Sequence, residues 1–260
     1  MNNWERYTFR DIINWKSGNT PSKQNEKFWG GSVPWISGKE INERFIFDAP
    51  LKLSEEGAVR AKLCESNDLL FLVRGQITDR LRLGISKGNF AFNQDIKCIT
   101  LKNNKLIGSD FLYYLIRGNE KDILNRVELT GLGAQKIDSD VFLNYEIKLP
   151  PPKQQRQITS FISEFDKKIE LNQKMNETLE EIAKTLFKSW FIDFDPVRAK
   201  AEGRPTGLSK EISDLFPDSF EDSELGEIPM GWKIITLESV FDVLGGHAFK
   251  SKDYSSDGIF

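Results

Sequence analysis

The chain has 260 residues and a formal net charge of −3, and 39% of its residues are hydrophobic, including 19 Phe and 6 Trp. This length fits one large domain or two modest ones, and this apolar content is enough for a packed core, which excludes a disordered chain. The chain has no run of 18 apolar residues and does not begin with a signal-peptide pattern. We therefore expect a cytoplasmic protein that does not associate with a membrane.

Cysteine and histidine are scarce, and this limits the chemistry available. The two cysteines, Cys64 and Cys98, are spaced neither as a disulfide framework nor as zinc ligands, so we predict two reduced core residues. His247 is the single histidine. A histidine-based catalytic triad, a His-rich zinc site and a histidine general base are therefore disfavoured, and we expect neither catalytic residues nor a metal site.

Charge is distributed unevenly along the chain. Residues 1–152 carry 22 Lys and Arg against 19 Asp and Glu, whereas residues 153–260 carry 14 against 20. A slightly basic first part can bind phosphates through a local patch, because the position of the charges matters more than their sum.

The first part, up to about residue 149, has the pattern of a mixed α+β domain. Short apolar runs between Gly, Asn, Ser and Pro clusters predict strands at residues 69–73, 90–92, 96–101 and 145–149. Helical spacing predicts a short helix at residues 54–62, starting at Ser54, and another at residues 109–117.

A long amphipathic helix is predicted to follow Pro150, Pro151 and Pro152, which end the last strand. Residues 153–191 contain no Gly or Pro, and an apolar seam repeats every seven residues with one polar member: Ile158, Phe165, Asn172, Leu179 and Leu186. The helix could be a packing element inside one globule or a coiled-coil spacer. Asn172 favours the spacer, because a polar residue in a seam specifies register. The partner helix could come from a later part of a longer chain or from a second copy.

The third part opens as a loop with turn residues at Gly203, Pro205 and Gly207 and then repeats the beginning of the chain. At an offset of 228 residues, the segment that starts at Trp4 aligns without a gap with the segment that starts at Trp232, and Gly18 aligns with Gly246. A repeat that begins again indicates the start of a second copy of the first unit.

Several motifs together resemble the specificity (S) subunits of type I restriction-modification systems. The resemblance is carried by Ser17-Gly18-Asn19-Thr20-Pro21-Ser22, Phe28-Trp29-Gly30-Gly31, Val33-Pro34-Trp35-Ile36, Phe90-Ala91-Phe92-Asn93-Gln94-Asp95 and Gly133-Ala134-Gln135-Lys136-Ile137. It continues along the predicted helix from Leu149-Pro150-Pro151-Pro152 to Phe191-Ile192-Asp193-Phe194-Asp195-Pro196. It covers nearly the whole chain.

The resemblance implies a mixed-sheet target-recognition domain at residues 1–152, a coiled-coil-forming spacer helix at 153–192, a loop-rich linker at 193–231 and the start of a second recognition domain at 232–260. It also implies a non-catalytic subunit that reads one half of a split site in double-stranded DNA and docks methyltransferase subunits through its helix. A restriction/translocase subunit is the further partner. S-adenosylmethionine and ATP are expected in those partner subunits, and no cofactor is expected on this chain. Family members usually carry two recognition domains, so a second copy could supply the other half through a homodimer.

Candidate DNA contacts are polar side chains in loops and at strand ends, where Arg suits guanine and Asn or Gln suits adenine. They are Ser17, Asn19, Thr20, Ser22, Lys23, Arg74, Gln76, Arg80, Arg82, Asn93, Gln94, Gln135 and Lys136. For each group the alternative is an ordinary surface turn whose side chains satisfy the local backbone.

Other functions remain open at this point. The phosphate-loop, metalloprotease, hydrolase-elbow and amino-methyltransferase motifs are absent, and Asp193 with Asp195 fits a turn cap better than a nuclease centre. A coiled-coil adaptor that binds protein is the main alternative, and an inactive remnant of a specificity subunit is a third. The salt dependence of binding distinguishes a DNA reader from a protein-binding adaptor, because DNA binding weakens steeply as ionic strength rises.

Overall fold

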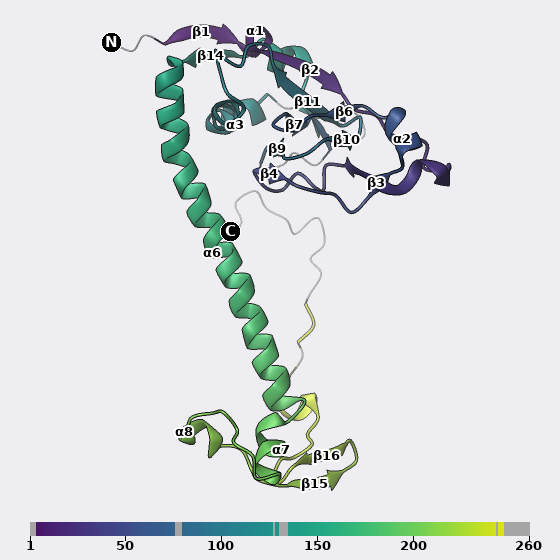
Figure 1. The fold of residues 1–260 in the computed structure, drawn as a ribbon, viewed down its shortest axis with the longest axis vertical. Helices are drawn as coiled ribbons and strands as arrows, with labels where there is room; N and C mark the ends of the chain where they lie inside the picture. Colours follow the sequence, from purple (N-terminus) through teal and green to yellow (C-terminus); the bar gives the residue numbers. More distant parts are fainter. Residues whose placement is uncertain (1–3, 76–79, 127, 130–134, 243, 247–260) are drawn as a thin grey trace. The chain divides into compact units, whose positions relative to one another are not determined.

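The computed structural model describes residues 4–75, 80–126, 128–129, 135–242 and 244–246 (Figure 1). The chain divides into two compact units, Met1–Ile169 and Glu170–Phe260. The first unit contains, in chain order, β1 (Glu5–Thr8), α1 (Phe9–Ile12), β2 (Ile13–Ser17), η1 (Glu26–Phe28), β3 (Trp29–Ile36), β4 (Phe45–Ile46), β5 (Lys52–Leu53), α2 (Glu55–Val59), β6 (Leu63–Cys64), β7 (Leu69–Leu72), β8 (Arg74–Gly75), β9 (Leu83–Ser86), β10 (Phe90–Phe92), β11 (Ile96–Leu101), α3 (Ser109–Gly118), α4 (Glu120–Leu124), β12 (Glu128–Leu129), β13 (Gln135–Lys136), α5 (Ser139–Leu143) and β14 (Glu146–Leu149). Helix α6 (Pro152–Phe191) begins in the first unit and ends in the second, which adds α7 (Asp195–Ala201), α8 (Lys210–Ser213), β15 (Phe220–Ser223), β16 (Gly226–Pro229) and η2 (Leu237–Ser239). The part of the first unit that precedes α6 is called the amino-terminal domain below.

A five-stranded sheet with the order β2-β11-β7-β9-β4 is central to this domain. Strand β11 is antiparallel to β2 and β7, β7 is antiparallel to β9, and β4 is parallel to β9. All four residues of β7 are buried, because both faces of the sheet are covered. The predicted strands at 69–73 and 96–101 are confirmed to within one residue.

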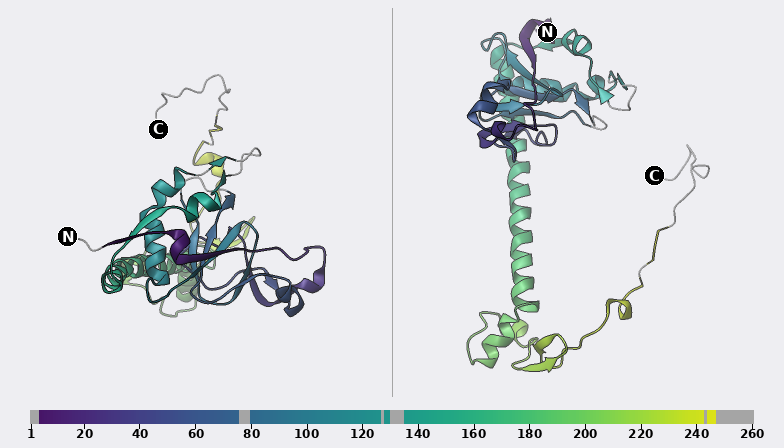
Figure 2. Two further views of the ribbon diagram at one scale, coloured as in Figure 1. Left: turned by 90° about the horizontal axis from the view of Figure 1, so that it is seen from above. Right: turned by 90° about the vertical axis from the view of Figure 1, so that its right-hand side faces the viewer.

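Alternate residues of the sheet enter two different cores, as the two-residue period of a strand requires. Phe71 belongs to the core that contains Leu112 of α3, and Leu70 belongs to the core that contains Phe92 of β10. Helix α3 contributes to the first core and the strands β3 and β10 contribute to the second, so they cover opposite faces of the sheet (labelled in Figure 1, with two further views in Figure 2). The α+β fold class predicted from the sequence is confirmed.

A second sheet, with the order β5-β3-β10-β6, covers the face opposite α3. Strands β3 and β10 run parallel, with Ala91 opposite Trp35. Cys64 lies in β6, Cys98 lies in β11, and both are buried free thiols, which confirms the prediction from their spacing.

Two predicted helices are present, and one of them is shorter than expected. Helix α3 matches the prediction to within one residue at its end, whereas α2 ends at Val59 instead of Lys62. Ser54 caps α2 by accepting the amide of Gly57 at 3.1 Å. Beyond Val59 the backbone is bonded to the opening loop instead, because Asn19 pairs with the carbonyl oxygen of Arg60 and the amide of Lys62.

The start of α6 is tied to the amino-terminal domain. Strand β14 ends at Leu149 and α6 begins at Pro152, as the three prolines predicted. Gln155 is buried, and its Nε2 donates to the carbonyl oxygens of Leu106 and Pro150, at 2.9 Å each. Ile158 packs against the core that contains Phe71.

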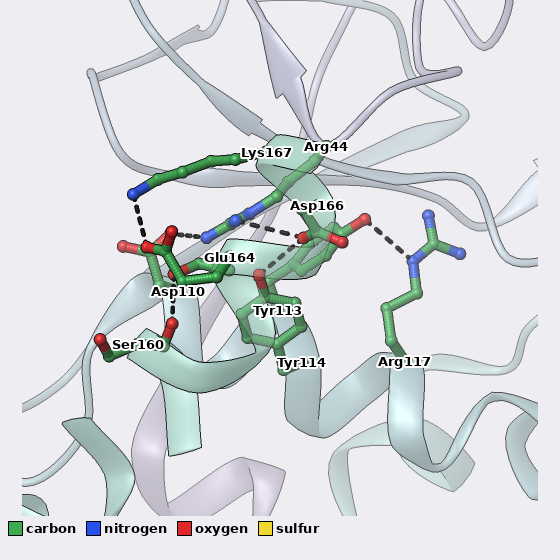
Figure 3. A network of polar contacts seen from close by, with 10 residues as sticks. Arg44, Asp110, Tyr113, Tyr114, Arg117, Ser160, Glu164, Asp166 and Lys167 are labelled. Atoms are coloured by element: carbon green, nitrogen blue, oxygen red, sulfur yellow. Dashed lines mark hydrogen bonds and ion pairs between the residues drawn. The ribbon is translucent and has the colours of Figure 1, made fainter. Parts of the chain in front are cut away.

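A polar network connects α6 to the domain again at Asp166 (Figure 3). The Asp166 carboxylate accepts the hydroxyl of Tyr114 at 2.6 Å and a guanidinium N–H of Arg44 at 3.2 Å. Arg44 also forms an ion pair with Asp110 of α3. These side chains hold α6 against α3 and the turn before β4.

The second unit corrects the prediction of a loop that starts at Asp193. Helix α7 occupies residues 195–201, with Pro196 in its first turn, where proline suits a helix. Asp195 accepts the hydroxyl of Ser189 at 2.7 Å, and Asp193 pairs with Lys188 at 2.7 Å. Strands β15 and β16 then form a hairpin.

Aromatic side chains hold this second unit together. The ring centroids of Trp190 and Phe216 lie 5.8 Å apart, and Trp232 lies 6.2 Å from Phe191 and 5.6 Å from Phe194. Trp232, the first residue of the internal repeat, is therefore packed against the end of α6. No helix among the described residues is both long and apolar enough to cross a membrane.

Candidate nucleic-acid interface

The loop after β2 is held tightly against the turn between β10 and β11. The amide of Gly18 donates to the carbonyl oxygen of Ile96 at 3.3 Å, and that of Asn19 donates to the carbonyl oxygen of Phe92 at 3.0 Å. A Cβ atom on Gly18 would lie 2.1 Å from the carbonyl oxygen of Phe92 and 2.4 Å from that of Asn93. Only glycine permits this approach, which places the opening loop beside Asn93 and Gln94.

Asn19 is used inside the domain. Its Nδ2 donates to the carbonyl oxygen of Arg60 at 2.7 Å, and its Oδ1 accepts the amide of Lys62 at 2.7 Å. Both polar groups of this side chain therefore connect the opening loop to the end of α2.

Ser17, Thr20 and Gln94 lie together at one edge of the domain. Thr20 donates its hydroxyl to Oε1 of Gln94 at 2.8 Å, a bond that does not use the amide N–H groups of the exposed Gln94. Ser17 accepts a hydrogen bond from Nζ of Lys97 on the neighbouring strand.

Lys97 is a candidate that the sequence reasoning missed. Burial lowers the pKa of its ammonium group, and the charge of Lys136 lowers it further. Its Nζ also lies 5.9 Å from the ring of Trp15. Two cations in the same neighbourhood repel each other and favour an anion beside them. The available clue was the position of a lysine inside an otherwise apolar strand, three residues after Gln94.

Arg74, Arg82 and Asn93 line a pocket of about 250 Å³ together with Lys39 and Asp95. Nη1 of Arg82 donates to the carbonyl oxygen of Gly38 and to Oδ1 of Asn42, at 3.0 Å each. The side chain of Asn93 is bonded to Asp95, accepting its amide at 3.1 Å.

Arg74 differs from its neighbours in this pocket. It is exposed, and its guanidinium has no bonding partner among the residues that the structure describes. It can therefore bind a ligand without breaking a contact to another described residue.

Gln135 and Lys136 extend this region as strand β13. In the pairing with β8, Gln135 lies opposite Gly75 and Lys136 lies opposite Arg74. Nζ of Lys136 is 3.9 Å from a carboxylate oxygen of Asp138, a loose pair that leaves the ammonium group accessible.

Four segments that are distant in the sequence thus form one basic surface. It consists of Ser17, Thr20, Arg74, Arg82, Asn93, Gln94, Lys97, Gln135 and Lys136. Cations line it, small polar side chains stand between them, and Asp95 is the acid in its pocket. Such a surface can bind phosphates and present hydrogen-bonding groups to base edges.

The remaining sequence candidates lie elsewhere. Lys23 lines a separate pocket of about 580 Å³ with Trp29 and Lys52, and its Nζ lies 5.4 Å from the ring of Trp35. Ser22 is exposed in the same loop, and its carbonyl oxygen accepts the indole N–H of Trp29 at 3.1 Å. Arg80 is exposed, whereas Gln76 lies outside the described residues, as do Gly133 and Ala134 of the loop before β13.

The predicted seam of α6 divides into two parts. Ile158 is packed on its own domain, whereas Phe165 is 58% exposed, Leu179 58% and Leu186 44%, and Asn172 is also exposed. From Phe161 to Leu186 the helix therefore carries an apolar stripe that no described residue covers.

Comparison with known proteins agrees with this picture. Residues 1–181 match the type I restriction modification DNA specificity domain. The chain is 31% identical over 231 residues to the specificity subunit of the type I restriction enzyme MjaIX of Methanocaldococcus jannaschii, a match that covers 86% of this chain and 51% of that protein. It is 29% identical over 224 residues to the HindI specificity subunit of Haemophilus influenzae, covering 83% of this chain and 46% of that protein.

A solved structure shares the fold. The S subunit of a type I restriction-modification system from M. genitalium superposes with a TM-score of 0.56 at 17% identity, over 73% of this chain and 46% of that one. The chain spans about half the length of the relatives that it matches. The family match covers most of this chain, and the chain accordingly belongs to the family of type I restriction-modification specificity proteins.

Proposed function

We propose that this chain is a DNA-recognition subunit of a type I restriction-modification complex and that its amino-terminal domain reads one half of a split target. The observation that carries the proposal is the basic surface, to which four distant segments contribute. Its side chains are of the two kinds that DNA reading requires, cations for phosphates and planar polar groups for bases.

Roles within the surface follow from the chemistry of each side chain. Lys97 and Lys136 are point charges suited to phosphates. Arg74 has the forked guanidinium that binds guanine bidentately, and it has no bonding partner among the described residues. The amide N–H groups of Gln94 suit adenine. Arg82 and Asn93, which are bonded within the domain, hold the pocket in shape.

The second half of the target requires a second recognition domain. The apolar stripe of α6 supports pairing with another helix, and a second copy of this chain would provide one together with a second basic surface. Asn172 would then set the register of the pair.

The internal repeat is an independent observation that supports a second recognition domain. Phe9, Ile12 and Ile13 are at most 2% exposed, whereas their counterparts Leu237, Val240 and Phe241 are 51–73% exposed. Leu237, Val240 and Phe241 therefore align with core residues of the first unit but are themselves exposed.

The partners follow from this arrangement. We propose that methyltransferase subunits dock on α6 and that a restriction/translocase subunit joins them, with S-adenosylmethionine and ATP bound by those subunits. The chain itself would carry no catalytic group. The described residues contain no cluster of three or more His, Cys, Asp or Glu side chains arranged to hold a metal.

Binding to DNA at several salt concentrations tests the proposal. The complex with its methyltransferase subunits should bind a specific duplex with an affinity that falls steeply as salt rises, with a logarithmic slope of about −0.9 per phosphate contact. A protein-binding adaptor would bind DNA weakly and without sequence preference.

Substitution of Arg74 separates base reading from phosphate binding. Arg74→Ala should relax discrimination at one base pair by about 1–3 kcal/mol and leave the salt slope unchanged. Arg6→Ala removes an exposed arginine from β1, away from the basic surface, and should leave both unchanged. Equal effects of the two substitutions would rule out Arg74 as a base reader.

A further inference from the structure

The Arg44 network is a partly buried charged contact between the amino-terminal domain and α6. Arg44 is only 10% exposed, and its guanidinium lies 4.5 Å from the ring of Phe45 and 4.7 Å from the ring of Tyr114. Its Nε atom is buried without a hydrogen-bond partner among the described residues. Buried ion pairs contribute little net stability, because the desolvation of the charges offsets their attraction. Such a pair does restrict the relative orientation of the elements that it joins, since each hydrogen bond requires a defined geometry.

Three elements meet at this guanidinium. The backbone of Arg44 is held to the central sheet, because its carbonyl oxygen accepts the amide of Ile85 at 2.7 Å. The side chain reaches Asp110 on α3 and Asp166 on α6, and Tyr114 adds a second bond to Asp166. Figure 3 shows Arg44 between the two carboxylates. Burial raises the pKa of Tyr114, and its bond to Asp166 raises it further, so the phenol remains a donor.

The network is the second of two separate attachments of α6 to the amino-terminal domain. The first is made by Gln155 together with Ile158, which packs against the core of the domain, and the 11 residues from Gln155 to Asp166 correspond to about 16 Å of helix. A groove of about 360 Å³ separates the loop around Lys105 from Arg156 and Ser160 of α6 between the two points. A helix attached only near its start, through Gln155 and Ile158, could pivot there, whereas the second attachment at Asp166 restricts its direction.

A small pivot has a large effect at the far end of such a helix. The 36 residues from Gln155 to Phe191 correspond to about 54 Å, so a rotation of about 5° displaces the end by roughly 5 Å. One base pair of DNA rises by about 3.4 Å. A change of a few degrees in the direction of α6 therefore displaces its far end by as much as the rise of one base pair.

We infer that the Arg44–Asp110–Tyr114–Asp166 network is a positioning device that fixes the direction in which α6 leaves the amino-terminal domain, and so restricts the spacer length accepted between the two halves of the DNA target. The spacer-length part rests on the proposed function. The four side chains lie outside the basic surface, so their loss should change spacing and not base choice.

The first test measures the direction of the helix without DNA. Spin labels at Glu55→Cys in α2 and Lys174→Cys in α6 report the distance between domain and helix, and Cys64 and Cys98 are too buried to take up label. We expect one narrow distance distribution in the full chain and a clearly broader one after Asp166→Asn. Glu164→Gln is the matched control, because Glu164 pairs with Lys167 on the exposed side of the same helix turn. Equal widths in the Asp166 and Glu164 variants would overturn the inference.

The second test measures spacer tolerance. The complex with methyltransferase subunits is titrated with duplexes whose half-sites are one base pair closer, correctly spaced, or one base pair further apart. For Asp166→Asn and for Tyr114→Phe we expect the preference for the correct spacing to fall roughly tenfold, the effect of one lost charge-assisted hydrogen bond. Base preference within each half-site should stay the same.

The outcomes are distinguishable from a failure of the proposed function. An unchanged spacer profile in both variants overturns the positioning role. A wild-type complex that recognises no split site overturns the proposed function, and the spin-label distances still decide whether the network directs the helix. Thermal unfolding of each variant shows whether a change in the direction of α6 occurs in a folded protein or results from loss of the fold.

Discussion

Gly18 offers the sharpest test of how the basic surface is assembled. Replacing it with alanine places a Cβ atom 2.1 Å from the carbonyl oxygen of Phe92, where ordinary contact requires more than 3 Å. The obstacle is backbone rather than a flexible side chain, so the loop or the β10–β11 turn must move by about 1 Å. Overpacking of this kind typically costs 1–3 kcal/mol. We expect about 3 kcal/mol for Gly18→Ala, since the hydrogen bond from Asn19 to Phe92 is disturbed as well.

Urea unfolding followed by tryptophan fluorescence measures this cost, with the m-value as a check on the transition. Gly118→Ala is the matched control, because Gly118 ends α3 and a Cβ atom there meets nothing within 4 Å. That substitution should be neutral or should stabilise by up to about 1 kcal/mol. If Gly18→Ala is as stable as Gly118→Ala, the opening loop is not packed on the turn and the basic surface is wrongly assembled.

Two further predictions concern the buried thiols and the exposed face of α6. Burial raises the pKa of Cys64 to about 11 and raises that of Cys98 further, so neither thiol should react with a disulfide reagent at pH 8 until urea unfolds the chain. Fast labelling of the native protein would contradict the burial of the two thiols. Because the unfolded thiols ionise near pH 9, the free energy of unfolding should fall as the pH rises above that value, by about 1.4 kcal/mol per pH unit per thiol. Leu179→Lys should abolish self-association in sedimentation experiments, because each copy loses about 1.5–3 kcal/mol of apolar burial. The control Gln173→Lys, on the side of the helix away from the seam, should still self-associate. Equal association of the two variants would contradict pairing through this seam.

The sequence predicted those features that depend on neighbours along the chain. The unbroken seven-residue repeat predicted α6 within one residue at each end, and the apolar runs predicted β7 and β11. The exposure of Arg74 and Gln94 was predictable because each follows a buried strand, where a side chain emerges at the edge of a sheet.

Features that depend on distant partners were not predictable in the same way. Asn19 resembles a DNA contact in sequence, yet it is bonded to Arg60 and Lys62, 41 and 43 residues away. The partners of Arg44 lie 66 and 122 residues away, and no periodicity marks an isolated arginine in a turn. Helix α7 was mistaken for a loop because Asp and Pro indicate a turn as well as they indicate the first turn of a helix.

Sequencing of modified DNA shows whether two recognition domains read a split DNA site. The chain would be co-expressed with its methyltransferase subunit, and modified adenines would be mapped across the host DNA. We expect a split motif with a constant spacer, palindromic if a second copy of this chain supplies the other half. A stable complex that leaves the DNA without any new motif would show that the chain does not direct modification to a split site.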